Sequence, residues 1–345
     1  MPEESIDHID FDKLNQNSIS TPLVNHIYTA DPSAHYFNGK IYIYPSHDID
    51  AGEAFDDLGS HFAMEDYHVI SMDNISSNAV DNGLALHVND VSWAERQMWA
   101  PDANAKDGKF YLFFPAKDYE GIFRIGVATS DSPIGPFKAE PNPIKGSFSI
   151  DPAVFKDDDN SYYMYFGGLW GGQLQRWRSG VFNAENPESP TAFIPKDKEP
   201  ALLPFVAKMR DDLLEFNEKP KPIQILNSNG DLLLAGDNDR RFFEAAWMHK
   251  HNGKYYFSYS TGDTHFICYA IGDNPYGPFT YMGKILNPVV GWTSHHSVCK
   301  VDGKTYLFYH DSSLSKGVTH LRCIKLTEIK YRSDGTIITI DPYKK

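Results

Sequence analysis

Three carboxylic acids stand at the same point of a repeated sequence pattern, each ahead of a run of aromatic residues: Asp31, Asp151 and Glu244. If the repeat brings them together, their charges repel and raise one another's pKa values, an arrangement tolerated chiefly where acid-base chemistry needs it. Two carboxyls with different pKa values can cleave a glycosidic bond, because one protonates the leaving oxygen while the other deprotonates water on the opposite face. A third carboxyl can tune the acid.

A plainer interpretation exists for two of these acids. Asp31 and Asp151 each precede a proline, and an Asp-Pro pair taken alone is more often a simple turn. Their shared position in the repeat favours the chemical interpretation. Glu244 is the strongest candidate, since two phenylalanines precede it and Trp247 follows closely. A carboxyl group in apolar company stays protonated near neutral pH.

The pattern that carries these acids is a short cassette, in which a leading residue is followed by a polar turn and an aromatic-rich strand. Its five copies begin at Asp31, Ala100, Asp151, Glu244 and His295. The turn is Asn-Gly or Asp-Gly in four copies, as at Asn38-Gly39, and Asn160-Ser161 in the third. These dipeptides accept a positive φ, and the alternating residues that follow are typical of a half-buried strand. Each copy is therefore predicted to be a β-hairpin whose faces need neighbours.

The spacing of the turns predicts an all-β fold, a five-bladed β-propeller formed by a single domain over residues 1–345. The turns fall at residues 39, 108, 160, 253 and 303, so that successive turns are 69, 52, 93 and 50 residues apart. Such intervals fit four-stranded blades with insertions. A second repeat supports this count, because Asp131-SPIGPF follows the second cassette as Asp273-NPYGPF follows the fourth. Its Pro-X-Gly-Pro-Phe pattern indicates a turn into an outer strand.

Two parts of the chain lie outside the repeat. Residues 1–20 form a predicted N-terminal extension. The longest interval leaves room for a sixth, degenerate blade, but residues 173–240 contain Pro-rich and charged segments and a short helical pattern near 201–216. We interpret this stretch as insertion-rich sequence between blades that shapes the rim of a pocket.

Composition excludes several classes of protein. With 345 residues, 41% of them hydrophobic, the chain can bury a large core, and a net charge of -14 argues against nucleic acids and anionic membranes as partners. No apolar run approaches the roughly 18 to 20 residues of a membrane-spanning helix, and the first residues lack the pattern of a secretion signal. Three widely spaced cysteines are expected to be buried thiols. These features predict a cytoplasmic enzyme.

Taken in order, the five motifs resemble glycoside hydrolase family 43, a family of five-bladed propellers. The matching segments, within roughly residues 22–330, are Ala30-Asp31-Pro32, Trp99-Ala100-Pro101-Asp102, Ile150-Asp151-Pro152-Ala153-Val154-Phe155, Glu244-Ala245 and His295-His296-Ser297-Val298. The resemblance implies hydrolysis of β-xylosides and α-L-arabinofuranosides with inversion, with Asp31 as the general base and Glu244 as the general acid. Asp151 would orient the substrate and raise the pKa of the acid. Base and acid carboxyls of an inverting enzyme stand about 6.5–9.5 Å apart, which admits the water.

The resemblance also implies residues that hold the substrate. Trp99 matches a wall of the family's pocket, and Arg322 matches an arginine that reads sugar hydroxyls. Trp170, in a glycine-rich loop, is a candidate second wall because sugar faces stack on aromatic rings. Core packing for Trp170 and a surface position for Arg322 are the alternatives. His296 is a further candidate for substrate contact, unless it faces the other side of its strand.

His295 matches an axial histidine that contacts a central calcium ion or its water shell. Calcium prefers oxygen ligands, so an ion beside a histidine would be mostly hydrated and structural, and the chemistry itself would need no cofactor. The alternative is a hydrogen-bonded core histidine without a metal.

The predicted function is the exo-acting release of xylose from short β-xylo-oligosaccharides, because the chain lacks a secretion signal that would bring it to the polymer. Short xylo- or arabino-oligosaccharides are thus the expected partners. Action on α-L-arabinofuranosides of arabinoxylan or arabinan is the close alternative, and endo-arabinanase activity is a distant one. A sugar-binding propeller without catalysis is the alternative from another class. It is disfavoured because a lectin more often repeats its binding residues, whereas here the leading residues differ between copies.

Overall fold

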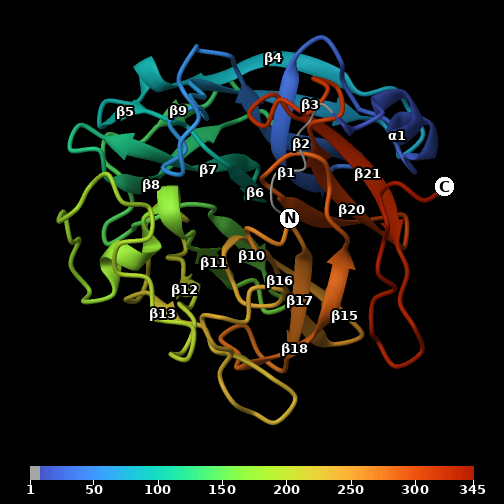
Figure 1. Ribbon diagram of the computed structural model, residues 1–345. Coiled ribbons are helices and arrows are strands. Elements are labelled where there is room, and N and C mark those ends of the chain that lie inside the picture. Colours follow the sequence, from blue (N-terminus) through green and yellow to red (C-terminus); the bar gives the residue numbers. More distant parts are fainter. Residues whose placement is uncertain (1–7) are drawn as a thin grey trace.

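The computed structural model of the protein describes residues 8–345, which form five β-sheets arranged around a central axis (Figure 1). The predicted all-β, five-bladed propeller is confirmed. The predicted N-terminal extension, residues 1–20, begins outside the described residues. Its described part contains one short helix, α1 (Phe11–Asn17), which Asp10 caps by accepting a hydrogen bond from the backbone N–H of Lys13.

Each sheet is one blade. The first blade comprises β1 (Tyr28–Phe37), β2 (Lys40–Asp48), β3 (Asp66–Met72) and β4 (Val80–His87). The second comprises β5 (Ala94–Arg96), β6 (Asp102–Lys106), β7 (Lys109–Asp118), β8 (Phe123–Ser130) and β9 (Lys138–Ala139). The third comprises β10 (Ala153–Lys156), β11 (Tyr162–Phe166), β12 (Phe205–Lys208) and β13 (Lys221–Pro222).

The last two blades complete the ring. The fourth comprises β14 (Ile225–Leu226), β15 (Glu244–His251), β16 (Lys254–Ser260), β17 (Ile267–Gly272) and β18 (Phe279–Leu286). The fifth comprises β19 (His296–Val301), β20 (Lys304–Asp311) and β21 (Cys323–Ile329). Between the described strands, the connections contain the short 3-10 helices η2 (Val88–Asp90), η3 (Trp170–Gly172) and η4 (Leu174–Trp177).

The five cassettes form the inner hairpins of the five blades. Their first strands, β1, β6, β10, β15 and β19, contact one another in that order, and β19 returns to β1. The turn residues behave as predicted, since Asn38 and Gly39 both have positive φ, 52° and 81°. The leading residues therefore stand around one axis.

The stretch 173–240 differs from the expectation of an insertion with a helix. The prediction of a short helix near 201–216 is wrong, because β12 lies there. This strand pairs with β11, with Phe205 opposite Phe166 and Val206 opposite Tyr165. Burial of these side chains in the third blade outweighs the local periodicity. The same stretch supplies β13 to the third blade and β14, which runs parallel to β18, to the fourth.

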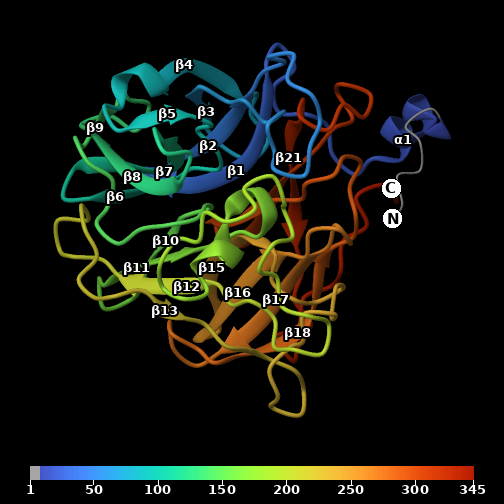
Figure 2. The same ribbon diagram turned by 60° about the vertical axis from the view of Figure 1, so that its left-hand side comes forward.

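The first and last blades are joined along β21. The segment after α1 runs beside this strand, where Leu23 donates from its backbone N–H to the carbonyl of Ile324 and Thr29 donates to that of Arg322, both at 2.9 Å. Helix α1 lies at the periphery beside the C-terminal residues (Figure 2), and Ile19 donates to the carbonyl of Pro342.

Two further expectations concern the cysteines and membrane spans. All three cysteines are buried and free, as predicted: Cys268, Cys299 and Cys323. Within residues 8–345, every helix is too short or too polar to cross a bilayer.

Candidate active site

A pocket lies where the innermost strands begin. Its lining includes the leading residue of every cassette: Asp31, Ala100, Asp151, Glu244 and His295. The repeat therefore brings the three acids into one cavity.

The backbone at these acids departs from regular strand geometry. Asp31 and Asp151 have φ values of 48° and 57°, and Ala245, directly after Glu244, has a φ of 61°. The pairing of β1 and of β15 shifts register at these points. Such bulges are common beside active sites, because they turn a side chain out of the alternation of its strand.

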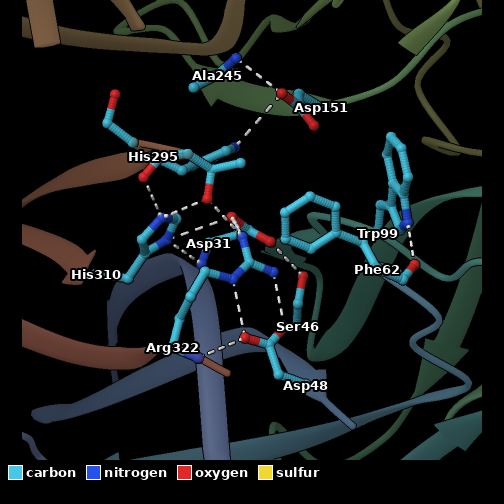
Figure 3. A network of polar contacts seen from close by, with 12 residues as sticks. Asp31, Ser46, Asp48, Phe62, Trp99, Asp151, Ala245, His295, His310 and Arg322 are labelled. Atoms are coloured by element: carbon cyan, nitrogen blue, oxygen red, sulfur yellow. Dashed lines mark hydrogen bonds and ion pairs between the residues drawn. The ribbon is translucent and has the colours of Figure 1, made fainter. Parts of the chain in front are cut away.

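Asp31 is a buried anion held by charged and polar groups. Its carboxylate accepts hydrogen bonds from the hydroxyl of Ser46 at 2.7 Å and from the guanidinium of Arg322 at 2.9 Å (Figure 3). Burial alone would raise the pKa of Asp31, but Arg322, the nearby histidines and the Ser46 hydrogen bond together lower it to about 2. Asp31 is therefore ionised throughout the neutral range.

Arg322 is shared between two carboxylates. Its Nε donates to Asp48 at 2.8 Å and its Nη2 donates to the other oxygen of Asp48 at 2.7 Å, while Nη1 donates to Asp31. This two-pronged contact fixes the plane of the guanidinium. The guanidinium also lies 4.9 Å from the ring centre of Phe62 at the pocket wall. Arg322 therefore lies in the pocket rather than on the surface.

His310 holds the backbone of Asp31. Its Nδ1 accepts a hydrogen bond from the Asp31 backbone N–H at 3.0 Å, and its Nε2 lies 3.1 Å from the hydroxyl and from the carbonyl oxygen of Thr293. This arrangement places the ring proton on Nε2. Burial and the nearby charge of Arg322 lower the pKa of His310 to about 3, so the ring is neutral.

Asp151 and Glu244 have the opposite electrostatic environment from Asp31. Asp151 accepts a hydrogen bond from the backbone N–H of Ala245 at 2.8 Å, which ties it to the strand that carries Glu244. Burial raises the pKa of both acids well above the usual range, and the charge of Asp31 adds to both shifts. Asp151 raises the pKa of Glu244 further. Although protein atoms crowd it, Glu244 keeps partial exposure to the pocket, so a protonated acid is within reach of a ligand.

His295 places one ring nitrogen in the cavity without a hydrogen bond. Its Nδ1 accepts from the backbone N–H of His296 at 2.8 Å, whereas its buried Nε2 has no hydrogen-bond partner among the described residues and lies 3.7 Å from Asp151. Burial lowers the pKa of His295, so the ring is neutral. Because Nδ1 accepts a hydrogen bond, the single proton of the neutral ring is on Nε2, and this N–H can donate to a water molecule or another oxygen in the pocket.

Aromatic rings line part of the pocket. Trp99 donates from its indole N–H to the carbonyl of Phe62 at 2.8 Å, and the two rings meet edge to face. Trp170, in η3, packs against Trp292 with ring centres 5.5 Å apart. The pocket lining therefore includes both tryptophans singled out in the sequence, Trp99 and Trp170.

His296 lies away from the pocket. It is fully buried in β19, and its Nε2 lies 2.6 Å from the hydroxyl of Ser258 in the fourth blade. The residue faces the other side of its strand. Its contact with Ser258 links the fourth and fifth blades and does not form part of the pocket.

Several residues of the site were not singled out in the sequence. The connection between β2 and β3 brings Phe55, Asp56 and Phe62 to the pocket. Ser46 and Asp48 come from the end of β2, and His310 from the end of β20. The sequence signal that could have identified them is the presence of polar residues at the end of otherwise apolar strands. Buried polar residues are unusual in a hairpin that only packs against its neighbours.

Comparisons with known proteins agree with this geometry. The sequence profile "Glycosyl hydrolases family 43" matches residues 19–189. The chain is 59% identical to Xylosidase/arabinosidase 43A of Humicola insolens over 93% of this chain and 99% of that protein. It is 53% identical to a beta-xylosidase of Xylanibacter ruminicola over 91% of this chain and 97% of that protein. A solved family 43 beta-xylosidase/alpha-arabinofuranosidase from a compost metagenome, in complex with xylotriose and in a calcium-free form, matches with a TM-score of 0.93 at 65% identity, covering 95% of this chain and 99% of that one.

Replacing Glu244 by Gln should stabilise the protein at neutral pH. An acid whose pKa is higher in the folded state than in the unfolded state supports folding fully below its unfolded pKa, and this support is lost as pH rises. The free energy of unfolding of Glu244→Gln should therefore exceed that of the wild type near pH 7, and the difference should grow as pH rises from about 4. The two proteins should be equally stable below about pH 4.

Urea unfolding at a series of pH values measures this difference. Glu65→Gln, the same substitution at a side chain that is 60% exposed, is the matched control. A Glu244→Gln difference that does not change with pH would contradict the raised pKa.

Proposed function

The chain belongs to glycoside hydrolase family 43, and we propose that it is an inverting, exo-acting β-xylosidase that releases xylose from short β-xylo-oligosaccharides. The relatives that it resembles over nearly their whole length are named xylosidases, and a similar structure contains xylotriose. The three acids lie together in one pocket at the axis, where the end of a sugar chain can enter.

One observation carries this proposal: two acids of one cavity have pKa values that are shifted in opposite directions. Glu244 is protonated and gives its proton to the glycosidic oxygen as the bond from that oxygen to the anomeric carbon breaks. Asp31 is ionised and takes a proton from a water molecule whose oxygen bonds to the anomeric carbon from the opposite face. One water is consumed, and proton exchange with solvent returns both acids to their starting states.

The remaining residues prepare this step. Asp151 raises the pKa of Glu244 and fixes the backbone after it, so its role is to tune and position the acid. Arg322 keeps Asp31 ionised and presents its guanidinium to the pocket, where it can meet sugar hydroxyls. Trp99 and Trp170 offer apolar surfaces for sugar faces.

Hydrolysis of α-L-arabinofuranosides is the second candidate function. The Humicola relative and a 56% identical protein of Bacteroides ovatus both carry the name xylosidase/arabinosidase. Xylopyranose and arabinofuranose differ in ring size.

Incubation with p-nitrophenyl β-xyloside and p-nitrophenyl α-L-arabinofuranoside, followed by proton NMR, tests both substrate and stereochemistry. The first sugar signal from the xyloside should be the α-anomer of xylose, because inversion reverses the configuration. Release of the β-anomer first would contradict the mechanism. Absence of turnover together with retention on a xylo-oligosaccharide column would favour a sugar-binding protein.

Glu244→Ala should slow hydrolysis of xylobiose by about 10²–10⁴-fold, because a sugar leaving group needs the proton, and should barely affect aryl xylosides with acidic phenols. Asp31→Asn is the matched comparison, since activation of water is needed whatever the leaving group. It should slow both substrates alike, as steady-state kinetics on the two substrates will show. Equal losses in Glu244→Ala would remove Glu244 from the role of acid.

We also infer that His295 contacts a hydrated calcium ion on the axis, in a structural role. The N–H at its buried Nε2 has no hydrogen-bond partner among the described residues, so it can contact the water shell of an ion rather than the ion itself, and the ionised carboxylate of Asp31 supplies negative charge nearby. These residues fit a cation whose ligands are mostly water. Such an ion would add positive charge to the cavity and leave the proton transfers to the carboxyls.

Calcium added to chelator-treated protein should raise the Tm of the wild type and leave that of His295→Ala unchanged. His249→Ala is the matched control, because His249 is also buried but contacts Tyr331 outside the pocket, and its calcium response should persist. An equal rise in His295→Ala would contradict the assignment.

A further inference from the structure

A group of three side chains on the first blade has the composition of a metal site and lies outside the pocket. His47, Asp66 and His68, here termed the blade-one cluster, present potential ligand atoms that all lie within 4.8 Å of one another. The Nδ1 of His47 is 2.6 Å from a carboxylate oxygen of Asp66, and the rings of His47 and His68 are centred 4.5 Å apart. None of the three lines the pocket.

Sheet register explains why these residues meet. In the pairing of β2 with β3, Ile41 lies opposite Met72 and Ile43 opposite Ile70, and extending this register sets His47 opposite Asp66. His68 is two residues beyond Asp66, so it shares the same face. The cluster therefore rests on two adjacent strands of a paired sheet rather than on a loop (Figure 1).

A second carboxylate orients one of the histidines. Asp81 in β4 lies 2.9 Å from the Nδ1 of His68, and it also accepts a hydrogen bond from the backbone N–H of Gly83 at 2.8 Å. A proton on Nδ1 leaves Nε2 of His68 with a free lone pair. Histidines that bind metals usually donate their other nitrogen to a carboxylate in this way, which fixes the ring and raises its basicity.

We propose that the blade-one cluster binds one divalent transition metal ion of the zinc class, with two imidazoles and one carboxylate as protein ligands. This set of nitrogen and oxygen donors suits zinc, whereas calcium and magnesium favour oxygen alone. The three side chains are 16–20% exposed, so an ion can enter from solvent and water can complete its coordination.

Such an ion would join two strands that support the pocket. His47 stands between Ser46 and Asp48 in β2, and these two neighbours contact Asp31 and Arg322 from the opposite face of the strand. Metal binding would cross-link β2 to β3 directly behind them. A rise in stability is therefore expected, because a ligand that binds the folded state shifts the unfolding equilibrium.

Zinc titration of the chelator-treated protein, with calcium in excess to fill any axial site, tests the proposal by calorimetry and by Tm. The wild type should bind one zinc ion per chain and gain in Tm. His68→Ala should lose this binding. Asp81→Asn keeps all three ligands and should bind about 10–100-fold more weakly, as expected for loss of the carboxylate behind a ligating histidine.

His87→Ala is the matched control, because His87 lies in β4 of the same blade, 3.9 Å from Glu65, but outside the cluster. It should bind zinc like the wild type. Circular dichroism of the metal-free variants shows whether each has folded, and Asp81→Asn decides the matter if His68→Ala does not fold. Absence of stoichiometric zinc binding in the wild type, or wild-type affinity in Asp81→Asn and His68→Ala, would overturn the proposal and leave two hydrogen-bonded His–Asp pairs.

Discussion

The buried guanidinium of Arg322 is the group on which the site depends most. It lies directly before β21, in the last blade, and binds Asp31 and Asp48 of the first blade. The same residue therefore joins the two ends of the ring and keeps the base ionised. Removing one partner from a buried ion pair typically costs about 3–5 kcal/mol, because a charge is left without compensation. Fold and chemistry are coupled at this residue.

The three acids share one cavity but have different distances to this cation. Asp31 touches Arg322, and its pKa falls to about 2. Asp151 instead accepts a backbone N–H, and burial raises the pKa of both Asp151 and Glu244. Five copies of a symmetric hairpin would give equivalent acids. The position of a single arginine breaks that symmetry and separates a base from an acid.

The sequence predicted those parts of the structure that depend on local signals. Turn dipeptides and alternating strands recur in every cassette, so the blades and the leading residues around the axis could be located. Ser46, Asp48 and His310 could not, because they become neighbours of Asp31 only when the ring closes. The helical pattern near 201–216 failed for a related reason, since its strand is stabilised by pairing with β11 rather than by its own periodicity.

Beside each acid the backbone leaves regular strand geometry at a residue with positive φ: Asp31, Asp151 and Ala245. An inner strand of a propeller alternates between two packed faces, so an acid that points into the axis must leave this alternation. Each such departure costs about 1–3 kcal/mol and persists only where neighbours enforce it. At Asp31 these neighbours are Ser46, His310 and Arg322. At the bulge after Glu244 the enforcing group is the carboxylate of Asp151, which takes up the N–H of Ala245. Asp151 therefore acts on Glu244 twice, through its charge and through the backbone, so a neutral Asn that keeps the hydrogen bond would remove only the first effect.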